Sequence, residues 1–234
     1  MILAFLMSAF LTGQTLAPQP AAKPVEGSKA LQLVGTAAPQ SATQFVLDSV
    51  IELEKVVDGI KNSTGKAKAE KEAELRRILS TKLDLSRLGQ RALISHWDEL
   101  GKTAKTRAQR ERYMKLFRQL IEENYMEQAR KYIGGDYVMT LTGEEKGPEG
   151  LTKVNGRIKK PDVDVIVEFH VVKAAPSWRI SDIQLDATSL EATYRSSFNR
   201  IIRKKGGLNQ GFPELLSTMD KRLAELKKGK ATKF

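Results

Sequence analysis

The chain has 234 residues, with 39 lysines and arginines against 28 aspartates and glutamates, no cysteine and two histidines. The lack of cysteine excludes thiol chemistry, cysteine-ligated zinc, iron–sulfur clusters and a lipid anchor on an N-terminal cysteine. His96 and His170 are too few for a histidine-rich metal site, so we expect no metal and no cofactor. The length suits one compact domain with a sizeable core.

Residues 1–17 are predicted to be a signal peptide. Their apolar run is about a dozen residues long, shorter than the roughly 20 that a membrane-spanning helix needs. Thr15-Leu16-Ala17 has the small residues of a cleavage site. A disordered or buried apolar N-terminus is the alternative interpretation. Residues 18–40 are rich in Pro, Ala and Gly without a period, which is typical of a flexible lead-in.

Four helices are predicted next, over residues 41–62, 66–82, 84–97 and about 103–132. The first has apolar residues at a four-three spacing. The second is helical by propensity, with a small apolar face formed by Leu75, Ile78 and Leu79. Asp84 is the predicted N-cap of the third helix.

After Gly134-Gly135 the hydrophobic period changes from helical to two. Four antiparallel strands are predicted, over residues 137–142, 151–159, 163–172 and 178–185. In the third strand Val165, Val167 and Phe169 face one way and the residues between them face the other. In the fourth strand the alternation slips between Ile180 and Ile183, which predicts a bulge near Ser181-Asp182.

The last strand leads directly into a helix that Ser189, or Thr188 beside it, is expected to cap. That helix ends at Gly206-Gly207, and a final amphipathic helix follows. The predicted fold is therefore α+β, a curved four-stranded antiparallel sheet with a helical layer packed across it. We expect a single domain over residues 41–228, followed by a short tail. Its helical part is 41–133, its sheet part is 136–186, its closing helices are 189–228 and the tail is 229–234.

No common enzyme motif occurs in the chain. His170 shares a strand face with Glu168 and could act as a base, although exposed polar residues on a half-wet sheet explain the pair equally well. Asp182 could be a buried acid, or it could satisfy the bulged backbone or pair with Arg195. An enzyme of this fold would need a polar pocket around these residues.

The C-terminal 40 residues hold eleven basic and three acidic side chains, a net charge of +8. Such a cluster favours an anionic partner, either a membrane surface, a lipid headgroup or a nucleic acid. Nucleic-acid binding is the less favoured alternative, because the aromatic residues lie on apolar stripes and are not interleaved with the basic ones. A solvated helical tail explains the charge equally well.

The segment after residue 177 has the pattern W-x-I-x-D, a short gap, then S-L-x-x-x-Y-R-x-x-F and a basic turn with Gly. This pattern resembles the MlaC (toluene-tolerance Ttg2-type) periplasmic phospholipid-carrier family, and a weaker match covers residues 84–97 and 107–117. Ala187 stands where the family usually has Gly, and Ser181 where it often has an aromatic residue. The matching residues are Trp178, Ile180, Asp182, Ser189, Leu190, Tyr194, Arg195, Phe198 and Gly206.

The resemblance implies an NTF2-like sheet, an internal apolar cavity for acyl chains and no enzyme activity. It also implies a periplasmic monomer, in transient and not integral contact with membranes. Its partners would be a phospholipid, or a hopanoid-type lipid, an MCE-domain protein of an inner-membrane ABC lipid transporter and an outer-membrane lipoprotein complex, with no nucleic acid. Arg195 is expected at the headgroup, and Val167→Trp is expected to block loading of lipid without loss of the fold. The expected cavity lining is Phe45, Leu53, Phe117, Leu120, Val138, Val154, Val167, Phe169, Ile183, Tyr194 and Phe198.

Overall fold

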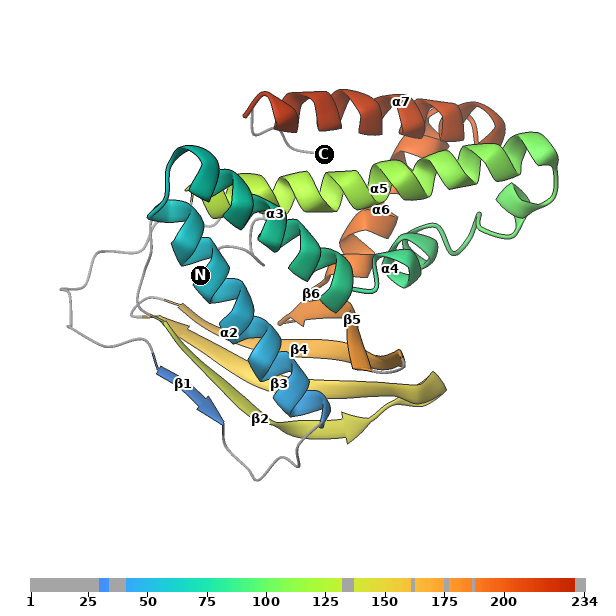
Figure 1. The fold of residues 1–234 in the computed structure, drawn as a ribbon. Coiled ribbons are helices and arrows are strands. Elements are labelled where there is room, and N and C mark those ends of the chain that lie inside the picture. Colours follow the sequence, from blue (N-terminus) through green and yellow to red (C-terminus); the bar gives the residue numbers. More distant parts are fainter. Residues whose placement is uncertain are drawn as a thin grey trace.

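The computed structural model describes residues 30–33, 41–131, 137–160, 163–174, 177–186 and 188–229. It shows helices packed over one face of a twisted sheet, with the long helices α5 (Ala104–Lys131) and α7 (Leu208–Lys227) side by side on the side away from the sheet (Figure 1). This arrangement confirms the predicted α+β fold. The expected signal peptide, most of the lead-in and the tail beyond Gly229 lie outside the described residues.

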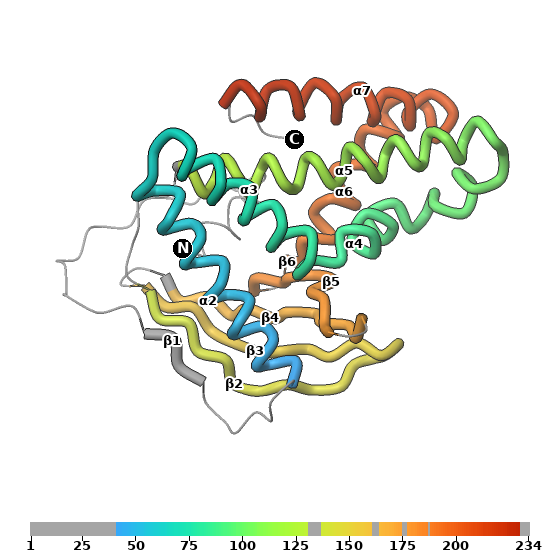
Figure 2. The backbone as a smooth tube through the Cα atoms, in the orientation of Figure 1, coloured from blue at the N-terminus to red at the C-terminus, as the bar shows by residue number. Residues whose placement is uncertain are grey.

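Helices α2 (Ala42–Lys61) and α3 (Gly65–Lys82) form a hairpin, and α2 crosses the sheet diagonally (Figure 2). Ser41 begins α2 by accepting a hydrogen bond from the Gln44 amide at 3.1 Å. The unpaired amides of the first turn need such acceptors, because no carbonyl of the same helix can reach them. The hairpin therefore places two helices directly above the inner face of the sheet.

Helix α4 (Leu85–Ala92) starts at the predicted cap, since Asp84 accepts from the Arg87 amide at 2.9 Å. It ends five residues earlier than predicted. A series of turns follows, then the short 3-10 helix η1 (Glu99–Gly101). The tertiary structure explains the difference, because Leu93 and Leu100 are both fully buried and the His96 side chain meets Asn199 Oδ1 at 3.0 Å.

The sheet contains the four predicted strands in meander order, and their bounds are β2 Val138–Lys146, β3 Leu151–Lys160, β4 Val163–Ala174 and β5 Ser177–Leu185. The 3-10 turn η2 (Pro148–Gly150) joins β2 to β3. Two short edge strands were not predicted. They are β1 (Ala30–Leu33), which pairs with β2 in parallel, and β6 (Thr188–Ser189), which pairs with β5. Successive strands from β2 to β6 pair with one another antiparallel.

The predicted bulge in β5 is present. His170 pairs with Asp182 while Val171 pairs with Ile180, so Ser181 is the extra residue. The bulge resets the alternation, which lets Ile180 and Ile183 both face the helices although they are three residues apart. On β4, Val165, Val167 and Phe169 are buried while Ile166 between them is 53% exposed, as the period of two predicts.

Helix α6 (Leu190–Lys204) continues directly from β6, and Ser189 caps it by accepting from the Ala192 amide at 2.9 Å. Its buried face brings Tyr194 and Phe198 against Phe117 of α5, with ring centroids 5.2 and 6.1 Å from that of Phe117. Such edge-on aromatic pairs stabilise a packed core beyond the area they bury. This aromatic cluster therefore fixes α6 to α5.

Candidate functional site

An apolar pocket lies between the α2–α3 hairpin, helix α5 and strands β4 and β5. Its volume is about 50 Å³. Tyr125 of α5 and Phe169 of β4 contribute aromatic rings to its wall, and burial raises the pKa of the Tyr125 phenol, so the wall there is uncharged at neutral pH. The lining residues are Ser49, Val50, Leu53, Ile78, Leu79, Lys82, Leu83, Tyr125, Phe169, Ile180 and Ile183.

Three of the residues predicted to line a cavity, Leu53, Phe169 and Ile183, lie in the wall of this pocket. The others, apart from Val138, belong to the same core or pack against it. Phe45 is half-buried on α2 beside the pocket, Leu120 is buried on α5, and Val138 is half-buried at the start of β2. Phe117, Tyr194 and Phe198 belong to the aromatic cluster between α5 and α6, and Val154 and Val167 are fully buried on β3 and β4.

The pocket is smaller than the roomy cavity expected from the sequence. Sites for drug-sized ligands typically have volumes of about 300–1,000 Å³, whereas this pocket has about 50 Å³. Close packing of the surrounding side chains keeps the pocket small, because atoms beside a void lose dispersion contacts. A long acyl chain can therefore enter only if the α2–α3 hairpin or the side chains on it move outward.

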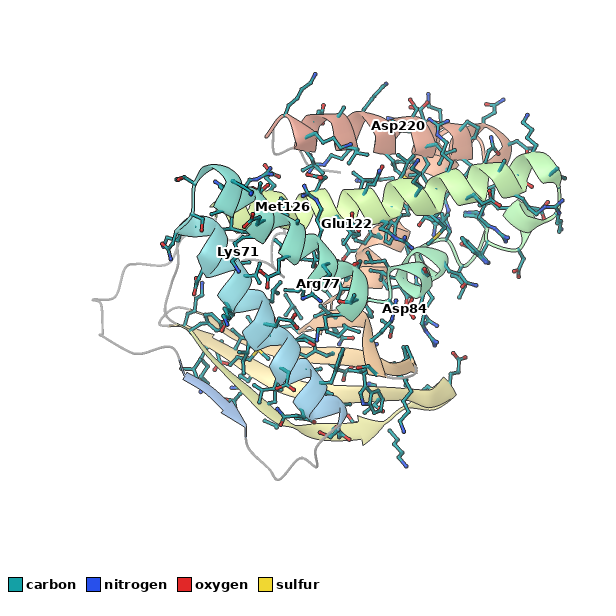
Figure 3. All side chains as sticks on the ribbon, viewed as in Figure 1. Lys71, Arg77, Asp84, Glu122, Met126 and Asp220 are labelled. Atoms are coloured by element: carbon teal, nitrogen blue, oxygen red, sulfur yellow. The ribbon has the colours of Figure 1, made fainter. Side chains whose placement is uncertain are left out.

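The mouth of the pocket is where its wall is partly exposed, at Leu53, Lys82 and Leu83, and charged residues lie there between α2 and α3. The Lys82 ammonium lies 3.0 Å from Glu52 Oε2, and Arg77 Nη2 lies 3.0 Å from Glu52 Oε1. Burial acts to raise the pKa of the Glu52 carboxyl, but the hydrogen bonds and charges of Lys82 and Arg77 outweigh it and the pKa lies below its ordinary value. Figure 3 labels Arg77 on α3, above the diagonal of α2. Glu52 is thus ionised and joins the two helices.

Lys82 and the α3 residues of the wall were not among the site residues predicted from the sequence. A signal for them was available, because Ile78 and Lys82 are four residues apart and lie on one face of a helix. A lysine on the apolar face of a helix indicates a place where that face reaches water. Leu79 and Ile78 were recognised as the apolar face, but not as part of a binding wall.

A polar cleft of about 140 Å³ lies at the bulged edge of β5, apart from the apolar pocket. His170 and Asp182 both line it, together with Arg87 and Arg91 of α4 and Glu191 of α6. These side chains have structural partners. Asp182 accepts from the Glu191 amide at 3.0 Å, and His170 hydrogen-bonds Glu168. The carboxylate of Asp182 therefore satisfies an amide at the start of α6. The structural roles expected from the sequence were instead contact with the bulged backbone or pairing with Arg195.

Arg195, expected at the headgroup, makes an ion pair with Glu191 at 3.2 Å, and Arg91 contacts the same carboxylate. Arg195 is not among the described residues that line the apolar pocket. An ion pair between Arg195 and Asp182 was one expectation from the sequence, but the partner of Arg195 is Glu191. Arg195 thus joins a network that holds α4 to α6.

Asp182 makes the stability of the fold depend on pH in a defined direction. Burial is the main influence on its carboxyl and raises its pKa above the ordinary value, although the Glu191 amide opposes this. Because the folded-state pKa is raised, this group stabilises the fold most at low pH, and that contribution is lost as pH rises through the raised pKa. Asp182→Asn keeps an acceptor for Glu191 but does not ionise.

We therefore expect the free energy of unfolding of Asp182→Asn, relative to the natural chain, to increase between about pH 4 and pH 7. Urea denaturation of both proteins at the two pH values measures this difference, and contributions from other carboxylates cancel. A variant that loses more stability at the higher pH than at the lower would contradict the account.

Among the described residues, no helix is long and apolar enough to cross a membrane. In the same part of the chain, no three His, Asp or Glu side chains gather closely enough to hold a metal ion.

Comparison with known proteins matches the sequence to one family. Residues 52–221, well over half of the chain, match the family described as MlaC protein. This chain belongs to the MlaC family. The match spans the second half of α2, helix α3, strands β2 to β6 and α6, and so includes all lining residues of the apolar pocket except Ser49 and Val50. A comparison with curated protein sequences found no match.

Among solved structures, the MlaC-family chain is similar to the phospholipid-binding protein from Ralstonia solanacearum in complex with a phospholipid. The two share 18% sequence identity and a TM-score of 0.59, over 80% of this chain and 98% of that one. At this identity the likeness shows a common fold. The family match confirms the resemblance that the strand-to-helix segment and the weaker helical matches had indicated.

Proposed function

We propose that this protein is a periplasmic lipid carrier that shields phospholipid acyl chains between its α2–α3 hairpin and its sheet. The observation that carries the proposal is the apolar pocket, whose wall is built from aliphatic and aromatic side chains and whose mouth is charged. Membership of the MlaC family and a phospholipid complex of a similar fold support it. The protein does no covalent chemistry in this role.

The energetics of the cargo explain why a closed site is needed. Removing a methylene group from water contributes about 0.8 kcal/mol, so two chains of about 16 carbons contribute on the order of 25 kcal/mol when fully covered. Spontaneous release into water is correspondingly slow. Transfer must therefore occur on a partner that receives the chains without exposing them.

The partners that we propose are an MCE-domain protein of an inner-membrane ABC lipid transporter and an outer-membrane lipoprotein complex. The protein would shuttle between them as a monomer, touching membranes only transiently. The basic C-terminal end would increase its rate of encounter with acidic receptors or anionic membranes, an effect that salt weakens. A hopanoid-type lipid is the alternative cargo, because the apolar wall selects for hydrocarbon and not for a particular chain.

The uptake of phospholipid from vesicles tests the proposal. The protein is incubated with vesicles that contain a fluorescent phospholipid, separated from them by size exclusion, and analysed for bound lipid. We expect about one lipid per chain in the protein fraction. A protein fraction without lipid, from a sample that is folded by circular dichroism, would argue against a carrier.

A further inference from the structure

We infer that Lys82 is the residue that binds the phosphate group of the lipid headgroup, at the mouth of the apolar pocket. The inference rests on the proposed carrier function and extends it to the headgroup. Of the described residues that line the pocket, Lys82 alone carries a charge. It stands on the last turn of α3, with about a quarter of its side chain exposed.

The position of Lys82 fits an amphiphile. Its methylene stem forms part of the apolar wall, while its ammonium group reaches the exposed end and lies 5.5 Å above the ring of Phe45. Lysine side chains commonly bury the stem and keep the charge in water in this way. A lipid whose tails enter the pocket therefore brings its phosphate, which is a few bonds from the tails, to the ammonium group.

The net charge at the mouth matches that of one phosphodiester. Lys82 and Arg77 are both bound to Glu52, so this trio of side chains has two positive charges and one negative charge. A phosphodiester carries one negative charge and accepts strong hydrogen bonds from cations. It can replace the Glu52 carboxylate at Lys82 while Arg77 keeps Glu52 neutralised. The α2–α3 connection through Lys82 is then exchanged for a contact with the cargo.

This exchange couples loading to the movement that the small pocket requires. The Lys82–Glu52 contact joins α3 to α2 across the mouth, and its loss leaves one bond fewer to hold the hairpin closed. Arg77 is 59% exposed, so its remaining pair with Glu52 resists opening only weakly. A lipid phosphate at Lys82 therefore favours the wider mouth that its own tails need.

The test compares two lipids that share the same acyl chains, phosphatidylglycerol, which has a phosphate, and diacylglycerol, which lacks one. Lys82→Met keeps the apolar stem and removes the charge. The matched control is Lys71→Met on the same helix, where Lys71 pairs with Glu74 at 2.7 Å and does not line the pocket. Binding is measured by partition of each fluorescent lipid from vesicles, and folding by circular dichroism.

We expect Lys82→Met to weaken the binding of phosphatidylglycerol about tenfold, because a hydrogen bond to a charged group contributes about that factor. Diacylglycerol binding should not be weakened, since the variant also lacks the Lys82–Glu52 contact that holds the hairpin closed. Lys82→Arg should retain phosphatidylglycerol, and Lys71→Met should bind both lipids as the natural chain does. Equal losses for both lipids, or no loss for either, would overturn the assignment of Lys82.

Two additional measurements distinguish failure of the carrier function from failure of the Lys82 assignment, and a lipid phosphate from a free one. If the natural chain takes up neither lipid, the carrier function itself fails and the inference with it. Calorimetric titration with inorganic phosphate should show no binding, since the tails supply most of the affinity. Binding of inorganic phosphate that Lys82→Met abolishes would assign the site to free phosphate and overturn the headgroup assignment.

Discussion

Leu53→Trp is expected to abolish most lipid binding while the protein stays folded. Leu53 is half-buried on α2 and lies in the wall of the apolar pocket, so the indole fills a space of about 50 Å³ without displacing the fully buried core. An acyl chain would then have to expel a well-packed ring. The cost of overpacking, about 1–3 kcal/mol, corresponds to a loss of affinity of about tenfold or more.

Ile51→Trp is the matched control, because Ile51 lies two residues away on the same helix and is 46% exposed. It adds the same ring on a surface that faces solvent. Lipid uptake from vesicles and thermal unfolding are measured for both variants. We expect Ile51→Trp to load as the natural chain does. Undiminished uptake by Leu53→Trp would show that the tails occupy another part of the core.

Leu53→Trp is a sharper test than Val167→Trp, the substitution that the sequence alone suggested. Val167 is fully buried, and its Cγ1 lies 3.3 Å from the position where a Cβ on Gly156 would be. Val167 is also absent from the described lining of the pocket. A tryptophan there would press against β3, so we expect the sheet to be destabilised and the effect on lipid to be uninterpretable.

Of the glycine-to-alanine changes at described positions, Gly211→Ala is expected to be the most destabilising. Gly211 is buried in α7, and a Cβ at that position would lie 2.3 Å from the carbonyl oxygen of Ile202 and 2.5 Å from its Cα. Both are backbone atoms of α6, so neither can move without shifting the helix. We expect a loss of about 3 kcal/mol or more in the free energy of unfolding, or failure to fold.

Gly59→Ala provides the comparison, since Gly59 is also inside a helix but its added Cβ meets only the Lys71 side chain, at 3.1 Å. A lysine stem can turn aside, and alanine favours helix over glycine by about 1 kcal/mol. Urea denaturation should therefore show Gly59→Ala to be at least as stable as the natural chain. A Gly211→Ala protein of unchanged stability would mean that α6 and α7 do not pack as closely as described.

Local patterns in the sequence predicted most of the fold, because they depend on neighbouring residues. Asp84 and Ser189 were identified as helix caps, and the slip between Ile180 and Ile183 located the bulge at Ser181. The early end of α4 was missed because distant contacts decide it. The pairing of His96 with Asn199 joins residues more than 100 positions apart, which no local pattern reveals.

The binding site was less predictable than the fold for a related reason. An apolar stripe shows that a residue is buried, but not whether it faces another side chain or a pocket. Phe198 and Leu53 have the same pattern, yet Phe198 packs in the aromatic cluster and Leu53 lines the pocket. The volume of the pocket depends on how closely α2 and α3 approach, and that distance is set by long-range contacts such as Lys82 with Glu52.

The most direct measurement is native mass spectrometry of the full chain after purification without detergent. Any lipid that co-purifies with the protein is then extracted and identified. Our account predicts an added mass equal to one membrane lipid per polypeptide, which appears in the Ile51→Trp protein and is missing from Leu53→Trp. A bare polypeptide mass for the natural chain, both as isolated and after exposure to phospholipid vesicles, would contradict it.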